Sequence, residues 1–264
     1  MRTTAIMNQK GGTAKTVTAI NTAAILARDY GHRVLLVDAD SQANLTEFVQ
    51  DEKQIAFRVD GHKGLADLLK GFRVLPWETK MLGVRLLPAT DDLMDLDVSK
   101  AGSGEADVMA LAEFLEENEQ NYDTVLIDCP PAFNAAAIAA LVAADDVVIP
   151  MKLDAFSIRG LANMLHQVQC MKKINTGLEI AGVLPTMWRD DLDKSMTKAE
   201  EKIRLSGLNV FPHIRYSPMK VDRSTFEQRA LIYSSPKCAA CRDYRSFAQN
   251  YLGESERGCN PDGV

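Results

Sequence analysis

Short apolar runs alternate with longer segments of helical period along most of the sequence. The apolar runs lie at residues 3–7, 33–38, 84–89, 122–128, 146–151, 179–187 and 209–214, and helical periodicity covers 15–29, 64–71, 105–120, 135–144, 157–173 and 194–207. Strands without polar alternation are typical of a parallel sheet whose two faces are both covered by helices. The pattern therefore predicts an α/β fold with a doubly wound, mostly parallel sheet and helices on both faces.

Local signals refine the limits of these elements. Gly31 is expected to end the first helix as a C-cap, and Ser157 is expected to cap the helix that follows the residues D-A-F. Residues 50–62 and 97–104 are polar and predict loops, and the region after about residue 215 is less regular. The sequence has no internal repeat, so we expect one domain over residues 1–253 and a polar, flexible tail over 254–264.

Composition limits the class of protein. A chain of 264 residues with 46% hydrophobic residues can bury one sizeable core. The net charge of −6 excludes a chain that is basic overall, although a local basic face remains possible. Five cysteines are too few and too uneven for a disulfide scaffold, and no secretory signal, membrane span or amphipathic tail is present. We expect a reduced, cytoplasmic protein without membrane attachment.

The segment NQKGGTAKTVTAIN, residues 8–21, lies between a predicted strand and a predicted helix. A strand, a glycine-rich loop and a helix in this order form a phosphate cradle, because backbone N–H groups and the helix N-terminus favour an anion. We expect Lys15 to bridge the β- and γ-phosphates and the Thr16 hydroxyl to ligate Mg²⁺. The alternative is a glycine turn with two solvated lysines. The residues expected to line the cradle are Gly11, Gly12, Thr13, Ala14, Lys15, Thr16 and Val17.

Three carboxylates follow two of the predicted central strands. Asp38 and Asp40 end the segment LLVDAD, and Asp128 ends YDTVLID. Ligands of open α/β sheets bind at this carboxyl edge. Because Mg²⁺ keeps several of its waters, a carboxylate there can accept hydrogen bonds from them, which is the role of a Walker B residue. We assign this role to Asp128, through water; the alternative is a residue that caps a turn.

The string KGGTAKT, with Lys10 before the paired glycines, resembles the deviant Walker A loop X-K-G-G-x-x-K-[ST] of the ParA/MinD family of P-loop ATPases. That pattern does not require glycine at Gln9 and Ala14, where the strict phosphate-loop pattern is missed. VDADSQANLT and LIDCPPAF resemble the family's D-x-D-P-Q-x-N-x-T and I-D-x-P-P segments. The resemblance covers residues 1–190 well, continues weakly to about 250, and is strongest to the short, Soj-like ParA type.

The resemblance implies an ATPase with ATP and Mg²⁺ as cofactors that forms a homodimer when ATP is bound. Lys10 would reach across the interface to the phosphates held by the other subunit. Asp40 would orient the attacking water, with Asp38 nearby as a magnesium-side carboxylate, so Lys10, Lys15 and Asp40 would be the catalytic residues. Hydrolysis, stimulated by a ParB-like partner, would loosen the dimer and drive partition or positioning of DNA.

Three departures from the family pattern affect nucleotide binding. Val17 stands where a second threonine usually offers a hydroxyl, so it can supply only its backbone N–H. Ser41 replaces the usual proline after Asp40, which leaves that backbone less constrained. The family's I-P-R stretch beside the base is I-R-Y here, which places Arg215 and Tyr216 at the expected base site.

The C-terminal third is the basic part of the chain. Residues 186–245 carry 12 Lys+Arg and 8 Asp+Glu, a net charge of +4, against −10 for the remainder. A basic stripe suits phosphate contacts without base readout, and ParA-like proteins bind DNA nonspecifically in this region. The alternative is a solvated helix face. No helix-turn-helix segment precedes the loop, so the chain resembles the short ParA type, and we expect that it does not read an operator. This resemblance implies a nucleoid-associated protein. The predicted DNA-binding residues are Lys194, Lys198, Lys202, Arg215, Lys220 and Arg223.

Two other functions remain open. Cys238 and Cys241 form a C-x-x-C pair, and some relatives in the superfamily share an iron–sulfur cluster on such a pair across a dimer. Two small residues at a helix start would give the same sequence. An ATP-dependent small-molecule ligase could use the same phosphate loop. The four histidines have no metal-ligand spacing.

Overall fold

The computed structural model describes residues 1–50, 64–96, 106–189 and 195–253. Its sheet has seven strands in the order β3-β4-β2-β5-β1-β6-β7. Every pair is parallel except that of the short edge strand β3 with β4. The predicted doubly wound, mostly parallel sheet is confirmed. The strands are β1 (Arg2–Ile6), β2 (Val34–Asp38), β3 (Trp77–Glu78), β4 (Val84–Leu87), β5 (Thr124–Asp128), β6 (Asp146–Lys152) and β7 (Glu179–Thr186).

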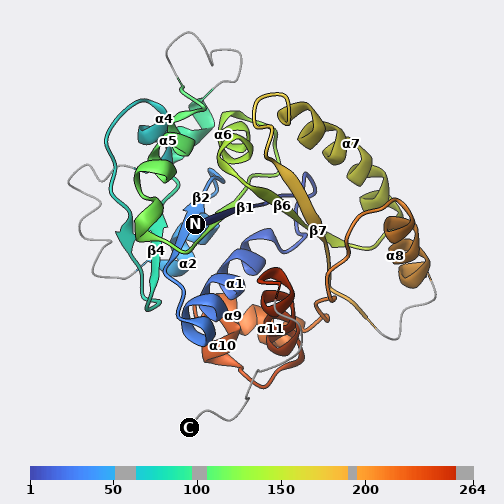
Figure 1. Cartoon of the computed structure of the whole chain (residues 1–264). Helices are drawn as coiled ribbons and strands as arrows, with labels where there is room; N and C mark the ends of the chain where they lie inside the picture. The colour runs from blue at the N-terminus through green and yellow to red at the C-terminus, as the bar shows by residue number, and fades with distance from the viewer. Residues whose placement is uncertain (51–63, 97–105, 190–194, 254–264) are drawn as a thin grey trace.

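Helices cover both faces of the sheet. Figure 1 shows α1, α9, α10 and α11 on one side and α4, α5, α6 and α7 on the other. Each side has its own cluster of buried apolar side chains. The helices are α1 (Lys15–Tyr30), α2 (Asn44–Val49), α4 (Leu65–Leu69), α5 (Ala110–Glu117), α6 (Ala135–Ala143), α7 (Ala155–Met171), α8 (Ser195–Leu205), α9 (Pro218–Phe226), α10 (Leu231–Ser234) and α11 (Ala239–Tyr251), with 3-10 turns at Asp91–Asp95 and Glu119–Asn121.

One of the two predicted caps is confirmed and the other is wrong. Gly31 ends α1 in the left-handed region at φ 70°, and its N–H donates to the Leu26 carbonyl. The helix predicted to be capped by Ser157 instead begins at Ala155, with Asp154 as its N-cap. The Asp154 carboxylate accepts the Ser157 N–H at 2.8 Å, so Ser157 lies inside the first turn.

Several elements differ from the sequence pattern. The short helix α2 and the strand β3 were not expected, and residues 216–253, the described part of the less regular region, hold three helices. Residues 209–214 add no strand to the sheet and make only an isolated bridge, Val183 with Val210. Apart from Gln50, the predicted loops at 50–62 and 97–104 and the tail at 254–264 lie outside the described residues. Within the described part, no helix is long and apolar enough to cross a membrane.

Candidate nucleotide and magnesium site

The loop between β1 and α1 is shaped to bind an anion. Gly12 and Ala14 both adopt left-handed backbone conformations, at φ 71° and 69°, a geometry that turns successive N–H groups toward one point. A Cβ atom added to Gly11 or Gly12 would meet no atom within 4 Å, so the space above the loop is open. The Thr186 hydroxyl at the end of β7 donates to the Thr13 carbonyl at 3.1 Å and fixes the far side of the loop.

The first turn of α1 offers its positive end to this space. Ala14 is the N-cap and contributes no side-chain hydrogen bond, and the first turn contains no acidic residue. The amide groups at the helix N-terminus are therefore left for an external acceptor. Lys15, the first residue of α1, is only 8% exposed, and Thr16 is half-buried. The structure thus brings the two predicted phosphate and metal residues to one place.

Asp38 and Asp128 lie side by side at the carboxyl edge of the sheet. They are register partners on β2 and β5, and Ile6 of β1 pairs with Asp128 on its other side. Both side chains are buried, with 0% and 1% exposure. Neither oxygen of Asp128 has a hydrogen-bond partner among the described residues. Burial raises the pKa of Asp128 well above its usual value, and the nearby charge of Asp38 raises it further. The side chain of Thr16 and the positive charge of Lys15 act in the opposite direction and lower the pKa.

Asp38 has partners that Asp128 lacks. One Asp38 oxygen accepts the N–H and the hydroxyl of Thr46 at 2.8 and 2.7 Å, and the other accepts the Asp40 N–H at 3.2 Å. Burial raises the pKa of Asp38 to about 7, although these hydrogen bonds lower it. Asp38 therefore anchors α2 to β2. Asp40 is partly exposed, and one of its oxygens accepts the Gln42 N–H at 3.0 Å.

The donor set fits a hydrated magnesium ion. Mg²⁺ takes oxygen ligands and keeps several waters, so a buried carboxylate with unused oxygens beside a threonine hydroxyl is a suitable environment. Thr16 would supply the direct ligand, and Asp128 would accept from a metal-bound water. When bound, the cation neutralises charge on the terminal phosphates of the nucleotide. It would also satisfy the two Asp128 oxygens, which have no hydrogen-bond partner within the described part of the chain.

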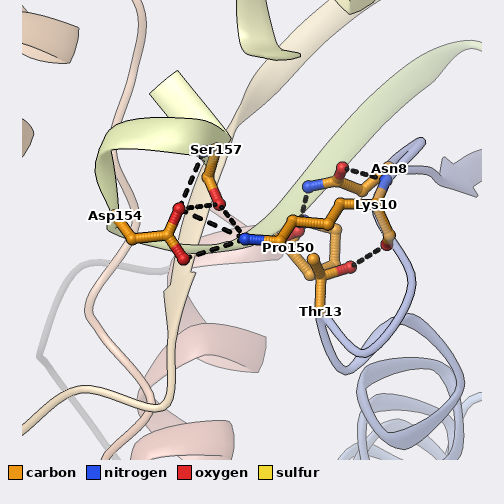
Figure 2. Close-up of polar contacts among 6 residues, drawn as sticks. All are labelled: Asn8, Lys10, Thr13, Pro150, Asp154 and Ser157. Atoms are coloured by element: carbon orange, nitrogen blue, oxygen red, sulfur yellow. Dashed lines mark hydrogen bonds and ion pairs between the residues drawn. The ribbon is translucent and has the colours of Figure 1, made fainter. Parts of the chain in front are cut away.

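Lys10 points away from its own phosphate loop. Figure 2 shows its side chain reaching toward Asp154 at the start of α7, where Nζ lies 2.9 and 3.2 Å from the carboxylate oxygens and 3.2 Å from the Ser157 hydroxyl. Asn8 supports the turn by accepting the Lys10 N–H at 2.9 Å. The pair is partly exposed, at 44% for the Lys10 side chain and 30% for Asp154. Such a pair is weak enough to open when a stronger anion is presented.

The remaining predicted residues come from several elements of the fold. Arg215 is held by Asp243 of α11, which accepts from its backbone N–H and its guanidinium at 2.7 to 3.2 Å. Lys198 and Lys202 lie on α8, whereas Lys220 and Arg223 lie on α9, and Figure 1 shows these helices on opposite sides of α11. Lys194 lies outside the described residues. The predicted DNA-binding residues within the described part thus come from α8, from α9 and from Arg215, and their contact with DNA stays a prediction.

Sequence reasoning missed the residues that position the others. Asp154 and Ser157 hold Lys10, and Thr46 holds Asp38. The signal for Asp154 was an aspartate three residues before a serine at a helix start, which is a common N-cap arrangement. Thr46 has no comparable signal, because its partner is eight residues away in sequence.

An anion-binding loop before α1 and a buried carboxylate at the end of the neighbouring strand define a P-loop nucleotide-binding protein. The AAA domain family model matches residues 1–180. The chain is 32% identical to the chromosome-partitioning ATPase Soj of Thermus thermophilus, over 96% of each chain. It is similar to apo McdA of Cyanothece, with a TM-score of 0.80, 25% identity and coverage of 96% and 100%. It is also similar to ADP- and magnesium-bound cobyrinic acid a,c-diamide synthase of Mycobacterium smegmatis, with a TM-score of 0.77, 28% identity and coverage of 96% and 94%.

The chain belongs to the ParA/MinD family of P-loop ATPases with a deviant Walker A loop, and is a Soj-like member. It is an ATP hydrolase, and the family resemblance predicted from the three motifs is confirmed. The similarity to Soj extends over the C-terminal helices, beyond residue 190 where the motifs end.

Proposed function

We propose that this protein positions or partitions DNA by a cycle of ATP-dependent dimerisation, nonspecific DNA binding and hydrolysis. The main support for the proposal is that Lys10 is separated from the other residues of the phosphate loop. The loop, Thr16 and Asp128 form a nucleotide and magnesium site within one chain, while Lys10 is directed out of that site. A lysine in that position can serve a facing subunit, where ATP presents charge that ADP lacks.

Each residue has a distinct task in the cycle. Lys15 and the amides of the loop hold the terminal phosphates, and Lys10 contacts the phosphates of the partner. Asp40, which is partly exposed, orients the attacking water. Release of phosphate removes the contact of Lys10 and allows it to return to Asp154. A ParB-like partner accelerates this step, and the protein acts in the cytoplasm on nucleoid DNA.

ATPase assays with and without nonspecific duplex DNA, at about 50 and 200 mM salt, test the DNA-binding part. We expect DNA binding that weakens with salt, because Lys and Arg contacts to phosphates release counterions. Replacing both Lys198 and Lys202 with alanine should reduce the salt slope by about 2 if both contact phosphates. Lys173→Ala, an exposed lysine outside the predicted set, is the matched control. DNA binding that is independent of salt and of these lysines would contradict this assignment.

Dimerisation is tested separately by sedimentation velocity with Mg·ATP. Lys10→Ala should bind nucleotide but remain monomeric, and Asp40→Ala should form dimers that persist because hydrolysis is lost. Wild-type dimers that form equally well without ATP would contradict the switch.

A second candidate is an ATP-dependent small-molecule ligase, favoured by the structural similarity to the diamide synthase. It predicts ATP turnover that requires an organic acid and is indifferent to DNA. Turnover in the absence of any organic acid separates the two functions.

A further inference from the structure

Cys238 and Cys241 occupy the first turn of α11 in very different environments. Cys238 is the N-cap and is half-buried, and its sulfur accepts the Cys241 N–H at 3.3 Å. Cys241 is 0% exposed and belongs to the apolar cluster between α11 and α1. The turn is closed by the Arg242 N–H, which donates to the Cys238 carbonyl at 3.2 Å. Cys238 is therefore the more exposed residue of the pair, and Cys241 is buried.

The spacing of the two cysteines in the helical turn suits a disulfide. Residues three apart in a helical turn have Cα atoms about 5 Å apart, which lies within the range of about 4.4 to 6.8 Å seen in disulfides. The intervening Ala239 and Ala240 have side chains too small to block rotation of either thiol. The Cys238 sulfur already lies 3.3 Å from the Cys241 backbone N, so the two thiols are close neighbours in this turn.

We propose that Cys238 and Cys241 form a reversible thiol–disulfide pair, with Cys238 as the attacking thiol and Cys241 as the resolving thiol. The reaction partner is a low-molecular-weight disulfide such as oxidised glutathione. The Cys238 thiolate attacks it, breaks its S–S bond and forms a mixed disulfide, and the first glutathione leaves and takes a proton. The Cys241 sulfur then attacks the Cys238 sulfur and breaks the mixed disulfide, and the departing second glutathione takes the Cys241 thiol proton. Two cysteine thiols are oxidised and one glutathione disulfide is reduced to two thiols.

The different burial of Cys238 and Cys241 determines which thiol reacts first with the external disulfide. Cys238 is half-buried at the start of α11, whereas Cys241 is fully buried, so an external disulfide can reach only Cys238. Burial raises the pKa of Cys241 to about 11, which keeps it protonated and unavailable to an external disulfide. It reacts only when a mixed disulfide is delivered beside it. No other cysteine of the described residues has a second cysteine within three positions.

The two cysteines lie in the helix whose next residues contact Arg215 and α1, the helix that begins at the phosphate loop. Asp243, two residues after Cys241, holds Arg215. The next residue, Tyr244, shares a 3.2 Å hydrogen bond with Thr18 of α1. A disulfide would fix the first turn of the helix that carries both contacts.

Trypsin provides a direct test, because Lys237 and Arg242 flank the pair and release it as the peptide CAACR. The folded wild-type protein is equilibrated in anaerobic mixtures of reduced and oxidised glutathione and quenched with acid. It is then unfolded in urea and blocked there with N-ethylmaleimide, so that the buried Cys241 is also labelled. The blocked protein is digested and weighed by mass spectrometry. We expect two maleimide groups on the peptide in reduced glutathione. In oxidised glutathione we expect no maleimide and the loss of two hydrogen masses.

Variants assign the roles. Cys241→Ser should accumulate glutathione on Cys238, Cys238→Ser should leave Cys241 free of glutathione, and Cys170→Ser, which removes an exposed thiol on α7, should change nothing. A peptide that carries two maleimide groups even in oxidised glutathione would overturn the proposal, and wild-type protein alone decides this. Iron that copurifies with the wild type and is lost in Cys238→Ser would overturn it in favour of a shared cluster.

Discussion

Replacing Asp154 with asparagine tests the proposed role of Lys10 most directly. The change removes the carboxylate charge that holds the Lys10 ammonium at 2.9 Å, but it keeps an oxygen that can accept the Ser157 N–H at the start of α7. Partial burial raises the pKa of Asp154, but the hydrogen bonds from Lys10 and Ser157 outweigh it and lower the pKa to about 2. The ion pair therefore persists throughout the neutral and mildly acidic range, and mutation is required to break it.

The expected change in dimer affinity follows from the partial exposure of the Lys10–Asp154 ion pair. Ion pairs between partly exposed side chains contribute about 0.2–1 kcal/mol. If Lys10 must leave Asp154 in both subunits before the dimer forms, removing the two pairs favours dimerisation by about 0.4–2 kcal/mol. The dissociation constant of the ATP-bound dimer should then fall by about 2- to 30-fold.

Sedimentation velocity over a range of protein concentrations, with Mg²⁺ and a non-hydrolysable ATP analogue, measures this constant. Asp92→Asn is the matched control, because it breaks an ion pair of the same 2.9 Å length, with Lys70, away from the loop. An unchanged or weaker dimer in Asp154→Asn, with nucleotide binding intact, would refute the reasoning that Asp154 restrains Lys10.

Three further predictions concern the buried part of the site. Lys15→Ala should abolish Mg·ATP binding in calorimetry while changing the free energy of unfolding by less than about 1 kcal/mol; retained binding would contradict the assigned role. Thr46→Val should cost about 1–3 kcal/mol in urea unfolding, because the buried Asp38 oxygen and the Ala89 N–H each lose a partner. Because burial raises the folded-state pKa of Asp38 to about 7, from about 3.9 when unfolded, the nucleotide-free protein holds an extra proton between these values. Its free energy of unfolding should therefore fall by about 1 kcal/mol as the pH rises from 6 to 8, and Asp38→Asn should show less of this decrease.

The strands and long helices could be predicted because their burial follows from local sequence. The strand β5, Thr124–Asp128, is buried at every position, and its apolar run is visible without any partner. The helix α2 was missed because six residues are too few to show a helical period. The helix α9 was missed because Met219 and Phe226 are 82% and 92% exposed, which disrupts the expected apolar stripe.

The predicted basic stripe shows what the sequence could not predict, namely how charged residues on different helices are arranged in space. Charge counted along residues 186–245 cannot reveal that α8 and α9 lie on opposite sides of α11, or that Asp243 holds Arg215. The distance between two side chains on different elements depends on how those elements pack.

By itself, the sequence determined the phosphate loop, the strand-end carboxylates and the family, because each is a contiguous string whose chemistry is local. Tertiary structure alone decided that neither Asp128 oxygen has a hydrogen-bond partner among the described residues while Asp38 is bonded to Thr46, that Lys10 is held by Asp154, and that Cys241 is buried while Cys238 is half-buried. These outcomes depend on desolvation and on hydrogen bonds between segments far apart in the chain, and both arise only when the sheet and its helices have packed.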